Sequence, residues 1–490
     1  MPHAVASGHR LTTQAAQDVL HAGGTATDAV FAAACLAFVA EPVLAQPLGG
    51  GFLMLAPAHA PPRLLDAFVQ TPRRKPPENA LDLATVTVDF GTATQDFHIG
   101  AGTIAAPSLI QGLFQAHADQ GRLPVADLVA PAVAAAKAGI AVTRFQSHLA
   151  GLVAPILTAD PQLAALHAPG GKIPEPGAAL ANPALADVLE VLAAEGPRFF
   201  AEGEVAQALA LLPGVGLSLA DIASAAPIWR RPLTIDRTGN RIALTPPPSH
   251  GGTLIALALD ALPPAPSPPT LAATLQAIAR LRAGGALPPQ RAITPALHAA
   301  LDRALRHPPA RRGTTHISVI DAAGNGAALT LSNGEGCGRL LPGTGIVPNN
   351  MLGEEDLLPG GALSWPTDTR LSSMMSPMAI GGPDGTLTLL GSGGSTRIWT
   401  ALTRAALEIV DHRAAPDAAI AAPRLHADAE ALHFERGPAA WDDALSPLEH
   451  ATPWDTPHMF FGGVHIVQRH RDGGTRAAAD PRRDGAAWSD

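Results

Sequence analysis

The chain has 490 residues, of which 47% are hydrophobic and 15% charged, and its formal net charge is −9. The high apolar content excludes an intrinsically disordered chain. The sparse and mainly acidic charge leaves no basic surface of the kind that binds nucleic acid. The two cysteines, Cys35 and Cys337, are too few for a disulfide scaffold, so we expect each to pack as a small hydrophobic residue.

The first strong helix signal is the apolar run at residues 29–40, which is shorter than the roughly 20 residues needed to span a bilayer. We predict a buried helix that starts at Thr27 and Asp28 and ends at Glu41 and Pro42. The first residues lack the charged and apolar regions of a secretory signal. This predicts a cytoplasmic protein, or a periplasmic one if the true start lies upstream of Met1, and we expect no membrane partner.

A glycine-rich stretch at residues 48–52 leads into a predicted strand, and residues 64–68 predict the next one. Further along, helices are predicted at residues 109–120, 125–138, 183–194 and 252–262. The chain contains neither G-x-x-x-x-G-K-[ST] nor G-x-G-x-x-G, which disfavours nucleotide binding. No H-E-x-x-H, no Cys/His ligand spacing and no G-x-S-x-G occurs, so we expect no metal, no cofactor and no serine-hydrolase elbow.

The second half begins with a predicted hairpin: a strand at residues 314–321, a turn at 322–325 and a strand at 326–332. Opposite positions in such a hairpin sum to about 646 or 647, so Thr314 should face Ser332 or Asn333. A second hairpin is predicted around the Pro-Asp-Gly turn at residues 383–385, followed by a glycine-rich turn and an amphipathic helix at 397–412. Residues 465–469 predict a final strand, and residues 479–485 a polar tail.

Gly313 and Thr314 stand at the start of the central predicted strand. On spacing alone they mark an ordinary strand start, because threonine favours strands. The alternative is a latent N-terminal nucleophile, since a cut after Gly313 would give Thr314 a free α-amine beside its own hydroxyl. Gly313 suits such a cut because a residue without Cβ tolerates strained backbone. We interpret the nearby His316 as structural rather than as a donor to substrate.

The motifs around this strand resemble the small subunit of the γ-glutamyltransferase (glutathione hydrolase) family: T-T-H-I-S-V-I-D, P-G-T-G-I-V-P-N-N, L-S-S-M-M-S-P and G-S-G-G-S-T-R-I. The first half adds A-S-G-H-R-L-T-T, L-G-G-G-F, A-P-S-L-I-Q-G-L and T-P-P-P-S-H-G-G-T in the family's order, so the resemblance covers essentially the whole chain. Members are N-terminal-nucleophile hydrolases made as one precursor that cuts itself before a threonine. The resemblance implies an α+β fold, a four-layer αββα sandwich of two stacked, mainly antiparallel sheets.

The same resemblance assigns the catalytic residues. It implies cleavage between Gly313 and Thr314 into a large subunit, residues 1–313, and a small subunit, residues 314–490, which together form one globular unit. Ser332 stands where relatives have a second threonine and would bond the nucleophile. The backbone N–H groups of Gly393, Gly394 and Ser395, at the start of a helix, would hold the developing oxyanion.

The predicted substrate pocket departs from the family pattern. Relatives with γ-glutamyl activity clamp the substrate α-carboxylate with an arginine and two adjacent serines. Ser372 and Ser373 keep the serines, but Phe68 stands in place of the arginine, and an aromatic ring cannot replace a bidentate guanidinium. On the α-amino side Met351 replaces an amide or acid ligand, although Glu354 could still supply charge.

Two further positions bear on this pocket. Gly334 replaces a polar ligand that the family pattern places two residues after Ser332. Arg73 or Arg74 could offer a replacement cation from a neighbouring turn. The resemblance therefore implies that the catalytic residues are kept while the glutamyl clamp is largely lost.

We therefore expect a self-processing amidohydrolase or acyltransferase that acts on a small-molecule amide or peptide, with water or an amine as acceptor. Glutathione and other γ-glutamyl amides are the family default, and the alternative is an acylase of the same family that acts on a different amide because of Phe68. A non-cleaving, ligand-binding relative and a structural role stay open. The ligand-binding relative predicts an unbroken chain, whereas the enzyme predicts two fragments that meet at Thr314. A structural role would need neither Thr314, Ser332 nor the glycine turn.

Overall fold

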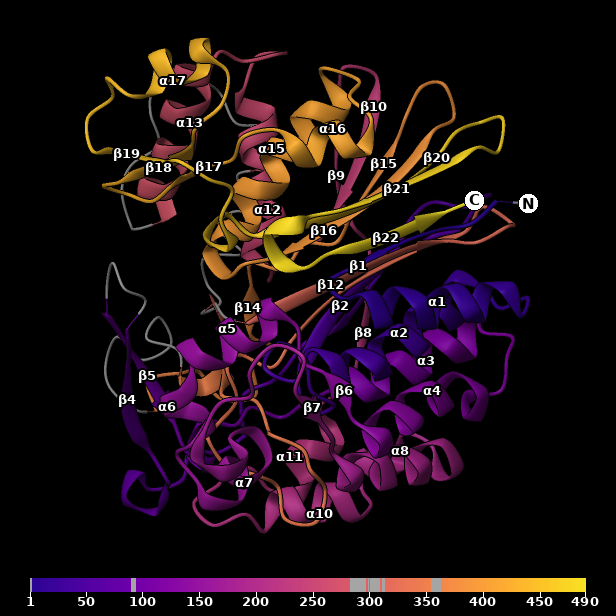
Figure 1. Cartoon of the computed structure of the whole chain (residues 1–490), viewed down its shortest axis with the longest axis vertical. Helices are drawn as coiled ribbons and strands as arrows, with labels where there is room; N and C mark the ends of the chain where they lie inside the picture. The colour runs from indigo at the N-terminus through magenta and orange to yellow at the C-terminus, as the bar shows by residue number, and fades with distance from the viewer. Residues whose placement is uncertain are drawn as a thin grey trace.

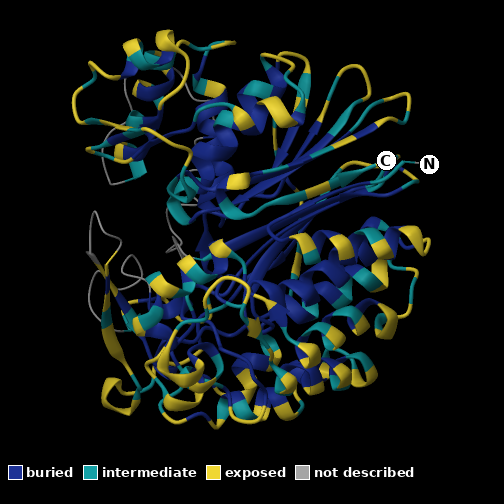
Figure 2. Ribbon diagram, in the orientation of Figure 1, coloured by how far each residue is buried: buried dark blue, intermediate teal, exposed yellow. Residues whose placement is uncertain are grey.

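Two stacked β-sheets form the centre of the molecule, and helices cover the outer face of each sheet (Figure 1). This computed structural model describes residues 2–89, 94–282, 297, 299, 309–310, 313–353 and 363–490. The buried residues follow the sheets and the helix faces turned toward them, so the core lies between the layers (Figure 2). The expected four-layer αββα sandwich is confirmed.

The first sheet has seven strands in the order β22-β1-β12-β13-β2-β3-β8, and all neighbours in it are antiparallel. Every residue of its three central strands is buried, because helices pack on one face and the second sheet on the other. The strands are β1 (Ala4–Ser7), β2 (Gly50–Ala56), β3 (Arg63–Ala67), β8 (Ile228–Arg230), β12 (Thr314–Ile320), β13 (Gly326–Ser332) and β22 (Ala486–Ser489).

The second sheet has six antiparallel strands in the order β21-β20-β16-β15-β10-β9. Its middle strands lie against β12 and β13 of the first sheet. The predicted hairpin around the Pro-Asp-Gly turn is confirmed, since it joins β15 to β16. The strands are β9 (Leu233–Arg237), β10 (Asn240–Leu244), β15 (Met378–Gly381), β16 (Leu387–Gly393), β20 (Gly463–Arg469) and β21 (Thr475–Ala479).

The helices that pack on the first sheet include α1 (Arg10–His21), α2 (Ala26–Ala40) and α3 (Leu109–Gln120), while α4 (Val125–Ala138) packs on α2 and α8 (Pro183–Glu195) on α4. The predicted helices at 109–120 and 125–138 match α3 and α4 to the residue. All of α2 is buried, but its cap is Thr25, whose side chain accepts from the N–H of Asp28 while the Asp28 carboxylate accepts from the N–H of Thr25. The predicted start at Thr27 was wrong by two residues, because the reciprocal cap is formed by Thr25 with Asp28.

The second sheet is covered by α12 (His250–Ala261), α15 (Ile398–Val410) and α16 (Pro416–Ala421). Beyond them α13 (Pro268–Arg282) and α17 (Ala439–Leu445) pack near a small sheet of β17 (Leu425–Ala427), β18 (Leu432–Glu435) and β19 (Ala451–Trp454). Within the described residues, no helix is both long and apolar enough to cross a bilayer. The remaining helices of four or more residues are α5 (Arg144–Leu152), α6 (Ala154–Leu157), α7 (Pro161–His167), α9 (Arg198–Ala201), α10 (Glu204–Ala210) and α11 (Leu219–Ser224). Short strands elsewhere are β4 (Ala84–Asp89), β5 (Thr94–Ile99), β6 (Ile140–Ala141), β7 (Ala179–Leu180), β11 (Pro309–Ala310) and β14 (Ser372–Ser373).

The last residues are not the polar tail that the sequence predicted. Asp480 is fully buried and pairs with Arg424 and Arg482, and Arg482 also pairs with Glu435. The chain then forms β22, which is an edge strand of the first sheet. The prediction was wrong because these charges are neutralised by partners distant in sequence, which makes their burial tolerable.

Candidate active site

Thr314 and Ser332 face each other at one end of the central hairpin. β12 and β13 pair in the register that places Thr314 opposite Ser332, which confirms the first of the two predicted alternatives. Both residues are buried, at 2% exposure each. The hairpin thus presents two hydroxyl side chains at the same end of two central strands of the first sheet.

The peptide bond before Thr314 is held by polar contacts on both sides. The Ser332 hydroxyl donates to the carbonyl oxygen of Gly313, and the same hydroxyl accepts from the N–H of Gly334 at 3.1 Å. The N–H of Gly313 donates to the Glu335 carboxylate at 3.3 Å. A donor on the Gly313 carbonyl withdraws electron density from its carbon and prepares it for attack. Sequence reasoning missed Glu335, because its contact depends on how the chain turns after β13.

Two glycines at this junction are required by close approach. A Cβ on Gly313 would lie 2.2 Å from the carbonyl oxygen of Gly334, so no side chain fits there. Gly334 has φ of +66°, and a Cβ on it would lie 2.0 Å from Asn350 Oδ1. Position 334 therefore carries no polar side chain in this chain because any side chain there would displace Asn350.

The glycine turn (residues 393–395) lies directly against the predicted nucleophile. It joins the end of β16 to a short helix η6 (Ser395–Arg397), which leads into α15. A Cβ on Gly393 would lie 2.1 Å from the carbonyl oxygen of Thr314. Gly394 has φ of +127° and Ser395 φ of +58°, and the latter is a strained conformation for a residue with a side chain. The structure thus brings together Thr314, Ser332 and the turn predicted to hold the oxyanion.

His316 is buried between the two sheets. Its Nδ1 is 2.8 Å from Thr330 Oγ1 and its Nε2 is 2.7 Å from Ser318 Oγ, so both ring nitrogens have partners within the sheet. The ring stacks on His465 at 6.3 Å, and burial lowers the pKa of His316 well below its usual value. A neutral, fully bonded imidazole agrees with the structural role that we predicted.

Ser372 and Ser373, which we call the serine pair, form the short strand β14 ahead of β15. The Ser372 hydroxyl accepts from the N–H of His250 at 3.1 Å, and the Ser373 hydroxyl accepts from the N–H of Met375 at 3.1 Å. β14 pairs in parallel with β11, which precedes the predicted cleavage point by only a few residues. The serine pair is therefore buried beside the segment that leads to Gly313.

Phe68 is part of the hydrophobic core. Its ring is fully buried and stacks on Phe52 at 5.5 Å. Its carbonyl oxygen accepts from Ser108 Oγ at 2.7 Å and from the guanidinium of Arg370. Arg370, which sequence reasoning missed, lies 3.9 Å from Asp66 and bonds backbone carbonyls, so it stabilises the backbone around Phe68.

The other predicted pocket residues differ in how far they are buried. Met351 is buried in the same core cluster as Phe68. Glu354 lies outside the described residues. Arg73 and Arg74 are both exposed on the surface, which does not favour a role as replacement cations.

Glu41 is a buried acid behind the nucleophile strand that sequence reasoning had treated only as a helix end. Its carboxylate accepts from Thr315 Oγ1 at 2.6 Å and from Thr12 Oγ1 at 3.4 Å. Burial raises the pKa of Glu41 to about 7, against the lowering effect of these hydrogen bonds. The signal in the sequence was an acid directly after an apolar helix, which alone could not reveal its contact with the residue next to Thr314.

Among the described residues, one group could supply three metal ligands: His3, His21 and Asp490. His3 precedes β1, whose Ala4 pairs with Ile320, so the group lies at the end of β12 remote from Thr314.

Comparison with known proteins identifies the family. Residues 12–279 and 287–489 match the family model described as gamma-glutamyltranspeptidase. The chain belongs to this family.

Its relatives within the family carry two kinds of name. The Acylase ACY 1 proenzyme of Pseudomonas sp. (strain SE83) is 29% identical, and the match covers 98% of this chain and 92% of that protein. The Glutathione hydrolase proenzyme of Bacillus subtilis (strain 168) is 26% identical over 99% of this chain and 90% of that protein. The chain described here, as a member of the gamma-glutamyltranspeptidase family, is therefore an enzyme of the hydrolase and acyltransferase type.

Solved structures support the fold. The cephalosporin acylase from Bacillus halodurans superposes with a TM-score of 0.82 at 22% identity, and the match covers 99% of this chain and 95% of that one. The αββα sandwich of this gamma-glutamyltranspeptidase family member is thus that of the N-terminal-nucleophile hydrolases.

Proposed function

We propose that the chain is a self-processing amidohydrolase whose nucleophile is Thr314 and whose preferred acyl group is not γ-glutamyl. The observation that carries this proposal is the position of Phe68, which is buried in the core against Phe52. The resemblance to the family's γ-glutamyl enzymes implies an arginine at this position in those enzymes. Loss of such a partner from a desolvated carboxylate costs on the order of 2–5 kcal/mol.

Self-cleavage would run as an acyl shift from nitrogen to oxygen. Thr314 Oγ attacks the Gly313 carbonyl carbon, the carbon–nitrogen bond breaks, and the nitrogen takes the hydroxyl proton. Water then hydrolyses the ester, which leaves a Gly313 carboxylate and a free α-amine on Thr314. The Ser332 hydroxyl on the Gly313 carbonyl supports this step, since it would stabilise the oxygen that becomes negative.

Amide hydrolysis would use the same atoms. Thr314 Oγ attacks the substrate carbonyl, the α-amine takes the hydroxyl proton and passes it to the leaving amine, and water releases the acyl group. The glycine turn adjoins the Thr314 backbone, which supports its role as the oxyanion site.

Glutathione hydrolysis is the second candidate. The retained serine pair and the relatives named glutathione hydrolases favour it. The buried Phe68 and Met351 and the relatives named acylases favour an acyl group without a free α-amine and α-carboxylate.

A panel of p-nitroanilides with one leaving group and three acyl groups separates the candidates. Intact mass first establishes that the protein consists of fragments 1–313 and 314–490. We then expect kcat/KM for pentanoyl anilide, whose acyl group carries neither carboxylate nor amine, to exceed that for γ-glutamyl anilide by about tenfold or more, with glutaryl anilide, which keeps the carboxylate, in between. A clear preference for γ-glutamyl anilide would overturn the acylase assignment. An uncleaved chain would overturn the assignment of Thr314 as the nucleophile.

A further inference from the structure

Two arginines flank the glycine turn without belonging to the predicted catalytic set. Arg397 ends η6, which follows the turn, and Arg483 ends the short helix η8 (Pro481–Arg483). We call them the arginine pair. A Cβ on Gly393 would lie 3.5 Å from Arg483 Nη1 and one on Gly394 3.5 Å from Arg483 Nη2, so this guanidinium touches the turn.

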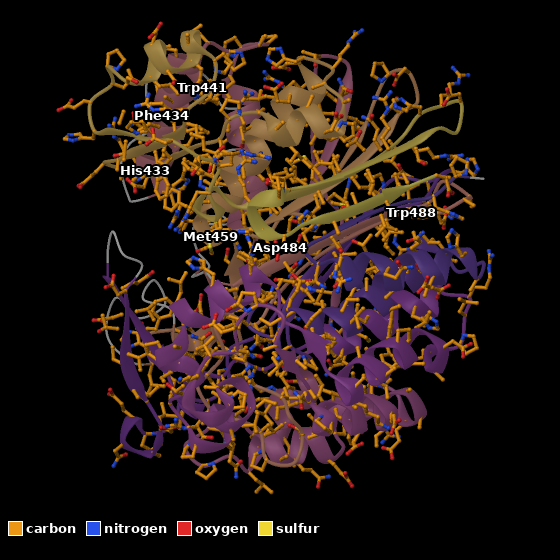
Figure 3. All side chains as sticks on the ribbon, viewed as in Figure 1. His433, Phe434, Trp441, Met459, Asp484 and Trp488 are labelled. Atoms are coloured by element: carbon orange, nitrogen blue, oxygen red, sulfur yellow. The ribbon has the colours of Figure 1, made fainter. Side chains whose placement is uncertain are left out.

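Arg483 is held in place by a backbone carbonyl and not by an acid. Its Nε and Nη2 donate to the carbonyl oxygen of Met459 at 3.2 and 3.1 Å. Met459 belongs to η7 (Met459–Phe461), which contacts η8. Met459 and Asp484, the residue after Arg483, are labelled in Figure 3. The guanidinium therefore keeps N–H groups for another partner.

Arg397 likewise forms no direct ion pair with an acid among the described residues. Its guanidinium lies over the ring of Phe460 at 4.4 Å, and its Nη1 donates to Thr396 Oγ1 at 3.2 Å. Its Nε is shielded from solvent and has no hydrogen-bond partner among the described residues. Burial lowers the pKa of Arg397 and of Arg483 to about 10, and the charge of Arg397 contributes to the shift of Arg483. Both remain cationic at neutral pH.

The neighbouring Arg482 shows the contrast. It forms ion pairs with Glu435 and Asp480, whereas neither member of the arginine pair forms an ion pair with a carboxylate in the part of the chain that the structure describes. Both guanidinium groups are half-buried, and the carboxylates that act on them, Asp428 and Asp480, do so without a direct ion pair. Such charges are only partly compensated, and two of them beside one turn repel each other. The arrangement is stabilised once an anion from outside the chain binds there.

The sheet order tells which part of a substrate this anion belongs to. β16 carries the glycine turn, with β15 on one side and β20 on the other. The serine pair leads into β15, while a Cβ on Gly463, the first residue of β20, would lie 2.8 Å from Arg483 Cδ. The serine pair and Arg483 therefore lie on opposite sides of the turn. The acyl and amine halves of an amide also lie on opposite sides of its carbonyl. If the carbonyl is bound at the turn and the acyl half lies beside the serine pair, as the family resemblance implies, the amine half lies beside Arg483.

We propose that the arginine pair binds a carboxylate on the amine half of the substrate. This inference rests on the proposed amidohydrolase function and names its substrate class: N-acyl amino acids, N-acyl peptides and other amides whose leaving amine carries an acid. Guanidinium groups suit this role because they bind carboxylates through paired, charge-assisted hydrogen bonds.

The test uses two leaving groups of the same shape. Each acyl chain of the panel is coupled to 4-aminobenzoate and to 4-aminobenzamide, and kcat/KM is measured for both. We expect the mature protein to prefer the 4-aminobenzoate amide by about 10- to 100-fold, mainly through KM, since hydrogen bonds to charged groups have this strength. Arg483→Gln should abolish the preference, and Arg483→Lys should keep part of it.

The matched control is Arg476→Gln, because Arg476 is an exposed arginine on β21 of the same sheet. This variant should keep the preference of the unaltered protein. If Arg483→Gln fails to fold, Arg397→Gln makes the same comparison. Equal kcat/KM values for the two amides, or a preference that survives Arg483→Gln, would overturn the inference.

A binding measurement separates this inference from the proposed function. Calorimetry on the unaltered mature protein compares free 4-aminobenzoate with free 4-aminobenzamide and requires no turnover. We expect tighter binding of the benzoate, and loss of that difference in Arg483→Gln. If the panel is not hydrolysed but this difference is found, the hydrolase proposal fails while the carboxylate site stands. If neither amine binds, or both bind equally, the carboxylate site is refuted.

Discussion

The Ser332 hydroxyl donates to the carbonyl oxygen of Gly313, the residue immediately before its cross-strand partner Thr314. This contact predicts that Ser332→Ala slows self-cleavage by about 100-fold, because removal of one oxyanion donor has effects of that size. Formation of the 314–490 fragment after synthesis is followed by intact mass. Ser332→Thr keeps a hydroxyl and should cleave at a rate near that of the unaltered chain. Equal rates for the alanine variant would rule out a role for this donor.

Thr314→Ala should give an unbroken chain without amidase activity, since the hydroxyl and the latent α-amine both belong to this residue. The expected loss of kcat is about a thousandfold or more. Thr314→Ser keeps a hydroxyl at the same position and should still cleave. A Thr314→Ala protein that splits at the same bond would show that another residue is the nucleophile.

Phe68→Arg should destabilise the protein and should not create a γ-glutamyl site. The ring is buried against Phe52, so the change would remove a core side chain and bury a charge, at a cost of about 3 kcal/mol or more. Chemical unfolding measures the difference. Leu211→Arg is the matched control, because Leu211 is 81% exposed and its change should cost about 0.5 kcal/mol or less. A stable Phe68→Arg protein with raised γ-glutamyl activity would contradict this view of the pocket.

Glu41 should make the protein less stable as the pH rises. Burial raises the pKa of the folded carboxyl from 4.5 to about 7, so between these values the folded state holds a proton that the unfolded state has released. Stability therefore falls from pH 4.5 to about 7 and then levels, with a total loss of about 3 kcal/mol from this group. Glu41→Gln should remove this slope when urea unfolding is measured at pH 5 and pH 8. Glu78→Gln, which changes an exposed acid, should keep the slope of stability with pH.

The sequence predicted the features that depend on nearby residues. The register of Thr314 with Ser332 follows from strand alternation and one short turn, and the bounds of α3 follow from its apolar spacing and the Gly121 that ends it. The start of α2 was missed by two residues because a threonine and an aspartate there allow more than one cap.

Features that depend on distant contacts were not predictable. Arg483 reaches the carbonyl of Met459 and the glycine turn, and Glu41 reaches Thr315, more than 270 positions away in the chain. The buried ion pair of Arg482 with Glu435 joins two elements whose proximity no local pattern encodes. The missed residues were therefore charged groups whose partners come together only in the folded sheets.

The order of strands in the first sheet has a consequence for the mature protein. Strand β1 of the first fragment lies between β22 and β12 of the second, and β13 of the second lies beside β2 of the first (Figure 1). If the chain is cut at the proposed bond, the two pieces stay interleaved through three seams of backbone hydrogen bonds in the first sheet and a further one, between β10 and β15, in the second. The two pieces cannot dissociate without breaking the hydrogen bonds of the sheet. Once unfolded, they must associate again as separate molecules. The proposed cleavage would thus turn one chain into a pair of chains that, after denaturation, would reassemble only at a rate set by their concentration.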